Sequence, residues 1–385
     1  MHSDTIAWRY GLMNALAIAF IIALVIGNGV WIWAVFGLSM FGLSVIDEVT
    51  DIEVSRLNRS AWWFYDANLY LTLPLVVIIT VLFVHHVISS DPFGLIYLLS
   101  HVGIKFESAH ALRDELTVVG AAAGTAYFYG TAGITVAHEL VHRTQSPIAM
   151  AVGRMLLGFS FSTTFSISHV HGHHRNVATY NDPGSSRRGE YVVTYAVRAL
   201  IGTTIEAFKI EASRLRRKGV SAWSLQNRAI RGQFYTIAIL MTVASFGGKR
   251  GVTAVAIAGI SAALIDHALE YVQHYGLARV EGEPVAPRHS WDCTRFVTNA
   301  LQYNLALHSD HHMAGGKPFW DLEARAEAPK LPCGYQTALL IAFIPPLWHR
   351  MIDPLIAKWD GQMASATELE LIRELGWEMP PPRQT

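Results

Sequence analysis

The feature that most constrains this chain is a stretch near its N-terminus, residues 10–46, that contains no Asp, Glu, Lys or Arg. A helix crosses the roughly 30 Å hydrocarbon core of a bilayer with about 20 apolar residues. The stretch is therefore long enough for two membrane-spanning helices, with Asn28-Gly29 as the turn between them. We expect an all-α integral membrane protein.

Four further apolar runs bring the prediction to six transmembrane helices. The six lie at residues 10–27, 30–46, 69–89, 116–137, 233–246 and 251–269. Only residues 247–250 separate the last two, so these two must form a tight hairpin. Charged residues make up 16% of the chain, against roughly 25% in soluble domains, which agrees with a membrane protein. With no repeat or low-complexity linker, the sequence predicts one domain, residues 1–385.

The basic residues predict the orientation of the spans. Lys and Arg are concentrated in residues 138–231, and positive residues near spans stay on the cytoplasmic side. Both termini, and the catalytic segments at residues 138–231 and 270–385, are then cytoplasmic, in what we expect to be a bacterial inner membrane. The formal net charge of +0 gives no excess of positive charge of the kind that binds nucleic acid.

The chain contains 18 histidines, and several have spacings that suit metal binding. His138 and His142 lie four residues apart at the end of the fourth span, so on a helix they share one face and can reach one metal. His169 and His173 repeat that spacing. His174 points about 100° round the helix from His173, which suits a second metal.

Two more groups complete the set. His274 follows the sixth span, and His308, His311 and His312 have i, i+3 and i+4 spacing, which places them on one helical face. Spans four and six run in the same direction in this topology, so all these histidines meet at the cytoplasmic face. Nine imidazoles exceed the four to six ligands that one ion takes. The sequence therefore predicts a two-metal site.

Carboxylates near these histidines are expected to hydrogen-bond to the ring nitrogens that do not bind metal, because metal-bound histidines usually donate their second N–H in this way. The candidates are Glu139, Asp182, Glu270 and Asp310. Glu139, between His138 and His142, can also be interpreted as the general base of a zinc protease. Of the nine histidines outside the ligand set, two lie close to these motifs: His171 breaks the spacing, and His267 is more typical of a packed side chain or a hydrogen-bond partner.

Together these motifs resemble the membrane-bound non-haem di-iron alkane monooxygenases and the related hydroxylase component of xylene monooxygenase. The resemblance covers most of the chain from His138 onward. It rests on residues 138–143 (HELVHR), 172–179 (GHHRNVAT), 182–183 (DP), 216–219 (RRKG), 274–277 (HYGL), 307–312 (LHSDHH) and 345–348 (PPLW). The resemblance implies two irons, O2 as the oxidant and rubredoxin as the electron donor. The ligands that it implies are His138, His142, His169, His173, His174, His274, His308, His311 and His312.

The chain departs from this family pattern at a few positions around the ligands. Ser168 precedes His169 where the family usually has Glu, and Glu270 and Gln273 stand where Asn and Glu are common. None of these changes removes an expected ligand. The hydrogen bonds around the metals, and with them the redox tuning, can therefore differ while the metal site is retained.

Cys293 and Cys333 are the only cysteines, too few for a four-cysteine iron centre within the chain. Electrons must therefore come from a partner, which the resemblance implies is rubredoxin, with rubredoxin reductase and NAD(P)H upstream. An apolar substrate can enter from the lipid bilayer. We expect O2-dependent terminal hydroxylation of medium-chain n-alkanes to 1-alcohols.

Four alternatives remain beside this expectation. The nearest is methyl hydroxylation of toluene- or xylene-type aromatics by the same site, and the next is a fatty-acyl desaturase or hydroxylase. An intramembrane zinc protease needs one zinc and few ligands, which leaves most of the histidines unexplained. A histidine-rich metal transporter would place ionisable residues along a path at mid-bilayer, whereas here the spans are almost free of them.

Overall fold

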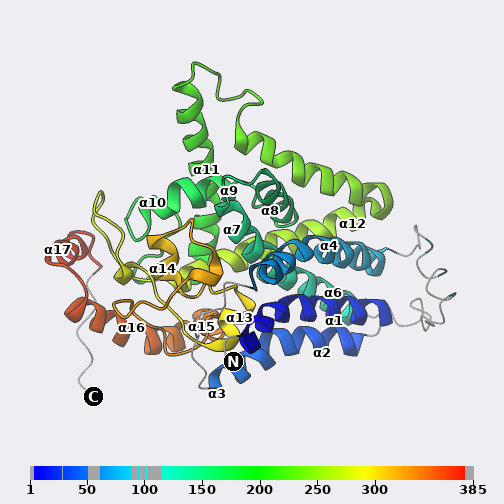
Figure 1. Ribbon diagram of the computed structural model, residues 1–385, viewed down its shortest axis with the longest axis horizontal. Coiled ribbons are helices and arrows are strands. Elements are labelled where there is room, and N and C mark those ends of the chain that lie inside the picture. The colour runs from blue at the N-terminus through cyan, green and yellow to red at the C-terminus, as the bar shows by residue number, and fades with distance from the viewer. Residues whose placement is uncertain are drawn as a thin grey trace.

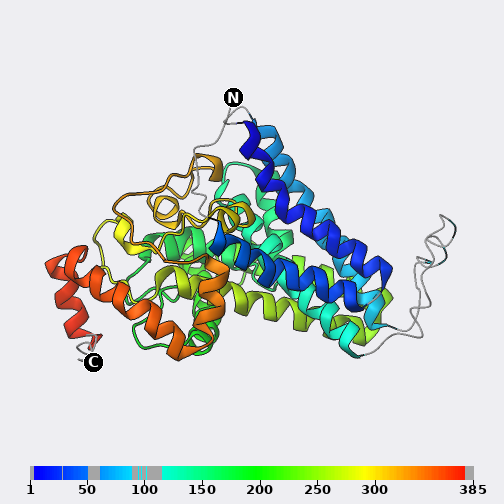
Figure 2. The same cartoon turned by 90° about the horizontal axis from the view of Figure 1, so that it is seen from below.

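The computed structural model describes residues 4–27, 29–50, 61–88 and 115–377, together with Gly94, Tyr97 and His101. Over these ranges the regular structure is helical, and the β-type pairing recorded there is one isolated bridge between Asp292 and Lys330. The N-terminal helices lie together on one side, and α16 (Pro345–Gln362) and α17 (Ala366–Glu374) lie at the opposite end (Figure 1). Figure 2 shows the same separation from below.

The first two predicted spans form a helical hairpin. The 3-10 helix η1 (Asp4–Gly11) and α1 (Leu12–Ile26) are followed by α2 (Gly29–Gly37), the π-helical η2 (Leu38–Gly42) and α3 (Leu43–Val49). Gly27 ends α1 with φ at 74°, and its N–H donates to the carbonyl of Ala23 at 3.1 Å. Only a residue without Cβ takes this left-handed conformation without strain. Asn28, which we expected in the turn, lies outside the described residues.

The third predicted span, α4 (Trp62–Val87), packs on α1 through a small polar cluster. The Asn14 Nδ2 group donates to the carbonyl of Asn68 at 2.8 Å and to its Oδ1 at 3.0 Å. The Thr72 Oγ1 group donates to Asn14 Oδ1 at 3.1 Å. Polar side chains buried among apolar helices must find such partners, so this cluster fixes the position of α1 against α4.

The fourth predicted span consists of three consecutive elements. They are α6 (Glu115–Phe128), the π-helical η4 (Tyr129–Ile134) and α7 (Thr135–His142). Two glycines let neighbouring helices approach closely. A Cβ at Gly120 would lie 2.8 Å from Nε1 of Trp33, and one at Gly124 would overlap the ring of Phe20. The span thereby carries His138 and His142 of α7 into the protein interior.

The fifth and sixth predicted spans lie within α12 (Arg228–His274), whose N-terminus is capped by Asn227. The helix breaks at Gly248, where φ is 54° and ψ is −158°. Figure 1 shows the two arms folding back on each other at this break. The second arm ends at His274, next to the other histidines.

The remaining helices surround the ends of these spans, and some of them, together with α16 and α17, build a second hydrophobic core around the C-terminal part of α12. Their bounds are α8 (Pro147–Phe159), α9 (Phe165–Ser168), η5 (His169–His173), α10 (His174–Asn176), α11 (Val192–Arg216), η6 (Pro287–His289), α13 (Phe296–Leu301), α14 (His308–Met313), η7 (Phe319–Asp321) and α15 (Tyr335–Ala342). In that second core, the rings of Tyr271 and Trp348 lie 5.4 Å apart. The core therefore joins α12 to α16 beside the histidines.

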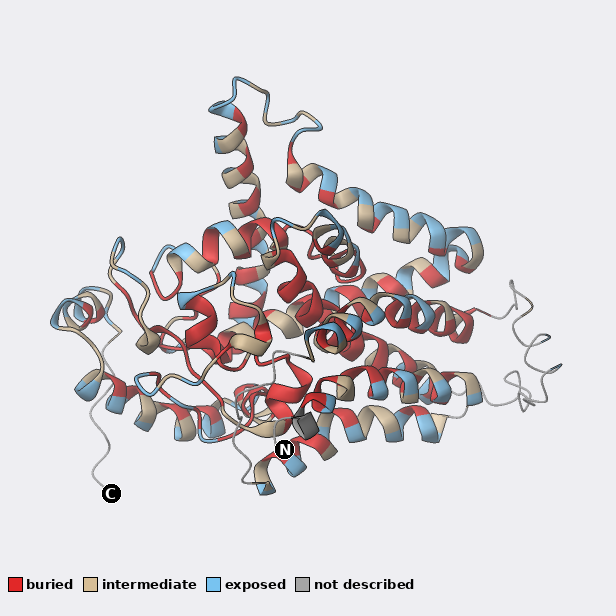
Figure 3. Ribbon diagram, viewed as in Figure 1, coloured by how far each residue is buried: buried red, intermediate tan, exposed pale blue. Residues whose placement is uncertain are grey.

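Four helical segments of the described chain are long and apolar enough to cross a membrane: Ala7–Ile26, Gly29–Val49, Trp62–Val87 and Arg228–His274. Figure 3 shows exposed residues on their outer faces and buried ones inside. On α1 the exposed face is apolar, because Ile18, Ile22 and Ile26 follow one another at four-residue intervals and are 43%, 52% and 45% exposed. Such contiguous exposed apolar surface is typical of a lipid-facing helix.

Candidate metal centre

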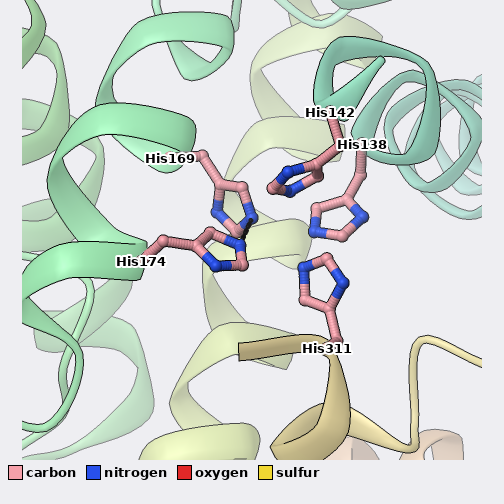
Figure 4. Close-up of side chains that lie close together, drawn as sticks. All are labelled: His138, His142, His169, His174 and His311. Atoms are coloured by element: carbon pink, nitrogen blue, oxygen red, sulfur yellow. Dashed lines mark hydrogen bonds between the residues drawn. The ribbon is translucent and has the colours of Figure 1, made fainter. Parts of the chain in front are cut away.

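The structure brings all nine predicted ligands together in two adjoining groups. The five-histidine group comprises His138, His142, His169, His174 and His311, and the four-histidine group comprises His173, His274, His308 and His312. Within each group the ligand nitrogens all lie within 4.8 Å of one another. Figure 4 shows the five rings of the first group converging from three segments of the chain. Residues more than 170 positions apart in sequence thus meet in one centre.

The local helix type decides how the second histidine motif divides between the groups. Residues 169–173 form the π-helical turn η5, in which i to i+5 hydrogen bonds replace the i to i+4 bonds of an α-helix. His169 and His174, five residues apart, therefore face each other, with their Nε2 atoms 3.1 Å apart. The pair that α-helical spacing predicted, His169 and His173, also has ligand atoms within 4.8 Å of each other and of Glu270, but His173 belongs in addition to the four-histidine group.

Helix α14 divides its histidines in the same way. His308 and His312 share one face, with Nε2 atoms 3.0 Å apart, and His308 Nε2 lies 3.0 Å from Nε2 of His274 at the end of α12. His311, next in sequence to His312 but about 100° round the helix, turns to the five-histidine group. The expectation that all three histidines of α14 serve one face is therefore replaced by a split between the groups. A Cβ at nearby Gly315 would lie 2.8 Å from Cε1 of His174, so the turn after α14 must pass close to the rings.

Several ring nitrogens in both groups have no hydrogen-bond partner among the described residues. These buried atoms are His138 Nε2, His142 Nε2, His169 Nδ1, His173 Nε2, His311 Nε2 and His312 Nδ1. An unpaired buried polar atom costs roughly 1–3 kcal/mol, and a bound metal ion removes that cost. Burial also lowers the pKa of His169, His174, His308, His311 and His312. These five rings are therefore neutral, the form that binds iron, zinc or copper.

Three histidines of the four-histidine group are held through the other ring nitrogen. His173 Nδ1 lies 2.8 Å from Oδ2 of Asp182, His274 Nδ1 lies 3.3 Å from the carbonyl of His289, and His308 Nδ1 lies 3.2 Å from the carbonyl of Leu305. Burial lowers the pKa of His173, but the Asp182 carboxylate outweighs this and raises it to about 9. Such contacts fix ring orientation and leave Nε2 for a metal.

The other predicted carboxylates lie in different surroundings. Glu139 accepts hydrogen bonds from Arg143 at 3.1 and 3.3 Å, and Arg143 also donates to Asp66 at 2.7 Å. Asp310 accepts from Lys317 Nζ at 2.6 Å and from the Glu323 N–H at 2.9 Å. Glu139 and Asp310 therefore take part in ion pairs that connect the histidine-bearing helices to neighbouring segments.

Glu270, one turn before His274 on α12, lies beside the ligands. Its Oε2 is 2.8 Å from Nδ1 of His267, and its Oε1 is 3.8 Å from Nε2 of His173. His267 therefore has a hydrogen-bonding position next to the centre, whereas His171 lies exposed on η5, outside both histidine groups.

Two cavities that the sequence did not predict adjoin the histidines. A small one of about 30 Å³ is bounded by His138, His169, His173 and His308. A larger one of about 340 Å³ lies between α2, α6, α12 and α15 and is mostly apolar. Thr135, Asp266 and Leu269 line both, so the two cavities are neighbours. The residues that line the larger cavity come from separate helices, and no local sequence pattern marks them.

Proteins similar to this chain come from families of membrane-bound oxygenases and desaturases. The model of the fatty acid desaturase family matches residues 116–338, more than half of the chain. The hydroxylase component of xylene/toluene monooxygenase from Pseudomonas putida is 30% identical over 360 residues, which cover 91% of both chains. That match covers a larger share of the chain than the family model does.

Alkane 1-monooxygenases are also similar to this chain. The protein from Acinetobacter baylyi is 35% identical over 225 residues, 57% of this chain and 55% of its own. Alkane 1-monooxygenase 1 from Pseudomonas aeruginosa is 34% identical over 233 residues, 59% of this chain and 60% of its own. These two matches thus span a little over half of each relative. With its apolar helices and its histidine centre, this integral membrane protein belongs to the membrane-bound non-haem di-iron monooxygenase family of the alkane 1-monooxygenases and xylene monooxygenase.

Proposed function

We propose that this enzyme hydroxylates the terminal carbon of medium-chain n-alkanes, using O2 and two electrons from rubredoxin at a two-iron site. The overall reaction is RH + O2 + 2 e⁻ + 2 H⁺ → ROH + H2O. Iron held by the nine histidines supplies the activation of O2 and the oxidation of the C–H bond. The residues of the chain bind the metals, orient the substrate and exclude water.

The observation that carries this proposal is the apolar cavity that adjoins the histidines. Its volume of about 340 Å³ lies within the range of small-molecule sites, roughly 300–1,000 Å³. Val119 and Ile257 line it and are also 54% and 59% exposed on the outer surface of candidate spans. A hydrocarbon dissolved in the bilayer can enter between these side chains. Its end then meets the small cavity beside His138 and His308.

The shape of this route supports terminal selectivity. The small cavity next to the histidines holds only about 30 Å³, roughly one water molecule by volume. A methyl group at the end of a chain fits that space, whereas the rest of the substrate stays in the larger apolar cavity. Holding the reacting carbon in one place in this way accounts for a large part of enzymatic rate enhancement.

We further propose six spans in a bacterial inner membrane, with the metal centre and both termini cytoplasmic. In support, the elements that carry the histidines, α7, η5, α10, α14 and the end of α12, lie together. The basic residues of 138–231 belong to the same part of the chain. The break of α12 at Gly248 supports two spans within that helix.

Rubredoxin as the electron donor is also a proposal. Cys293 and Cys333 are both buried, and two cysteines cannot form a four-cysteine iron centre. A polar recess of about 700 Å³ is lined by His174, Arg175 and Arg279. It gives a partner an approach to His174 of the five-histidine group, and it shares no lining residue with the apolar cavity.

A second candidate substrate is the methyl group of toluene or xylene. It is favoured by the xylene/toluene relative, whose match covers 91% of both chains, whereas the alkane relatives match over 57% and 59% of this chain. The same cavity and the same histidines would serve this reaction. Only the fit of the substrate in the larger cavity distinguishes the two.

An assay with ¹⁸O2 tests the proposal. Purified iron-loaded protein, rubredoxin, its reductase and NADH are incubated with n-alkanes of increasing length and, separately, with toluene and p-xylene. We expect ¹⁸O-labelled 1-alcohols from medium-chain alkanes. Labelled benzylic alcohol without labelled 1-alcohol would establish the second candidate instead, and a fully reduced, iron-loaded enzyme that labels neither product would contradict both.

A further inference from the structure

Glu270 lies where the two histidine groups meet. The ligand atoms of Glu270, His169 and His173 are all within 4.8 Å of one another. His169 belongs to the five-histidine group and His173 to the four-histidine group. A carboxylate in this position is close enough to bind a metal directly, and not only to hydrogen-bond to a histidine ligand.

The two oxygens of Glu270 have different surroundings. Oε2 lies 2.8 Å from Nδ1 of His267 and accepts a hydrogen bond from the Tyr195 hydroxyl at 3.1 Å. These two contacts prevent the carboxylate from rotating, and they leave Oε1 directed toward His173. Carboxylates that bind metals are commonly held in this way by hydrogen bonds from neighbouring groups.

The distance between Glu270 Oε1 and His173 Nε2 is 3.8 Å. This distance is too long for a hydrogen bond. It fits two ligands of one ion, because oxygen and nitrogen ligands each lie roughly 2.0–2.2 Å from a metal such as zinc. His173 Nε2 is one of the buried nitrogens without a hydrogen-bond partner, and Asp182 occupies the Nδ1 of the same ring at 2.8 Å.

The backbone next to Asp182 is packed against both Glu270 and His173. A Cβ at Gly184 would lie 2.7 Å from Glu270 Oε1 and 2.7 Å from His173 Nδ1. The Gly184 carbonyl accepts a hydrogen bond from the Tyr195 hydroxyl at 2.6 Å. The same tyrosine therefore ties this close-packed turn to the Glu270 carboxylate, which defines the position of Oε1 relative to His173.

From this geometry we infer that Glu270 is a metal ligand through Oε1, in addition to the nine histidines. The inference rests on the proposed two-iron site and deepens it, since it gives the centre one anionic ligand. The carboxylate then neutralises part of the metal charge, which an all-imidazole site cannot do. The ligand set becomes nine nitrogens and one oxygen.

Mössbauer spectroscopy of protein loaded with ⁵⁷Fe tests this inference. The samples are the wild type, Glu270→Gln, and the double variant in which Gln273→Glu accompanies Glu270→Gln. Gln273 lines the same small cavity, and its Nε2 is buried without a partner, so the double variant returns a carboxylate one turn away. Glu206→Gln is the control, because Glu206 is a glutamate with a buried unpaired oxygen that lies outside the metal-binding groups.

We expect the isomer shift and quadrupole splitting of one iron to change in Glu270→Gln, and its affinity to fall at least as far as the roughly tenfold loss that follows removal of an outer carboxylate. The double variant regains part of the affinity, and Glu206→Gln matches the wild type. The melting temperature of each iron-free protein separates a lost ligand from a lost fold.

Unchanged spectra and affinity in Glu270→Gln would overturn the inference. A lowered melting temperature of the iron-free variant, with no recovery of iron in the double variant, would also overturn it, because Glu270 then acts in packing. Recovery in the double variant supports the ligand role whatever the stability of the single variant. Wild-type protein without two irons would instead refute the proposed function, so the two failures are distinguishable.

Discussion

The Nδ1 atom of His173 lies 2.8 Å from Oδ2 of Asp182, and both side chains are almost fully buried. Asp182 is itself held, by the Ser185 hydroxyl at 2.6 Å and the Gly184 N–H at 3.0 Å. A carboxylate fixed in this way determines both the tautomer and the orientation of the imidazole. The Nε2 of His173 is thereby presented to the four-histidine group.

The first prediction concerns this pair. Asp182→Asn should weaken the binding of one of two irons by roughly 10- to 100-fold, the effect typical of losing a carboxylate behind a histidine ligand. Titration against a chelator measures the affinity. Asp353→Asn is a matched control, since Asp353 also contacts a histidine, His349 at 3.1 Å, but away from the metal groups. Equal iron affinity in Asp182→Asn and the control would refute the role of Asp182.

The second prediction tests whether Glu139 has a structural role or acts as a general base. Glu139 is paired with Arg143, which also binds Asp66 on α4 at 2.7 Å. Glu139→Gln should therefore lower the melting temperature and leave the iron content and the iron spectrum unchanged. Thermal unfolding and metal analysis on the same sample check this. A stable variant without activity would favour the zinc-protease interpretation of the motif instead.

The third prediction tests the substrate cavity. Ala126 lines the apolar cavity, so Ala126→Phe should fill part of it and lower kcat/KM for the longest substrates by tenfold or more, with unchanged iron content. A displacement of about 1 Å at the reacting carbon is enough for a loss of this order. Ile260→Phe is the control, because Ile260 is 47% exposed and does not line the cavity. Equal activity of both variants on every chain length would place the substrate elsewhere.

The fourth prediction concerns the contact between α17 and the loop behind His274. Glu368 is buried and accepts hydrogen bonds from His289 Nε2 at 2.7 Å and from Arg288 at 3.0 Å. The His289 carbonyl in turn lies 3.3 Å from Nδ1 of His274. Glu368→Gln removes the charge from this buried pair, and breaking such a pair costs roughly 3–5 kcal/mol. The variant should therefore have a lower melting temperature at pH 7.

The same glutamate gives a pH dependence. Burial raises the pKa of Glu368, but the bonds from His289 and Arg288 outweigh this and lower it from 4.5 to about 2. Because the pKa is lower in the folded state, the stabilisation is complete above about pH 4.5 and is lost as the pH falls toward 2. The difference in melting temperature between the wild type and Glu368→Gln should therefore shrink over that interval. A constant difference would contradict the assignment.

The apolar helices and the clustering of the nine histidines could be predicted because their signals are local. An uncharged run such as residues 10–46 has few alternatives to crossing the membrane as helices. Histidines at i and i+4, such as His138 and His142, share a helix face whatever surrounds them. For this reason all nine histidines could be identified before their positions were known.

The division of the histidines between two groups could not be predicted. It depends on the π-helical turn at residues 169–173, and no residue pattern predicts such a turn. In an α-helix His169 would pair with His173, but in this turn it faces His174. Likewise, Arg143 joins Glu139 to Asp66 on α4 by donating hydrogen bonds to both carboxylates. Such a contact depends on the packing of helices that are distant in sequence.

The central claim is that the nine histidines form a two-iron oxygenase centre, and metal analysis of purified protein tests it most directly. Inductively coupled plasma mass spectrometry, calibrated against amino-acid analysis, measures the metals in each chain. We predict two irons per chain in the wild type and a loss of iron when His169 or His308 is replaced by Ala. One zinc per chain, with no iron bound on reconstitution, would contradict the claim.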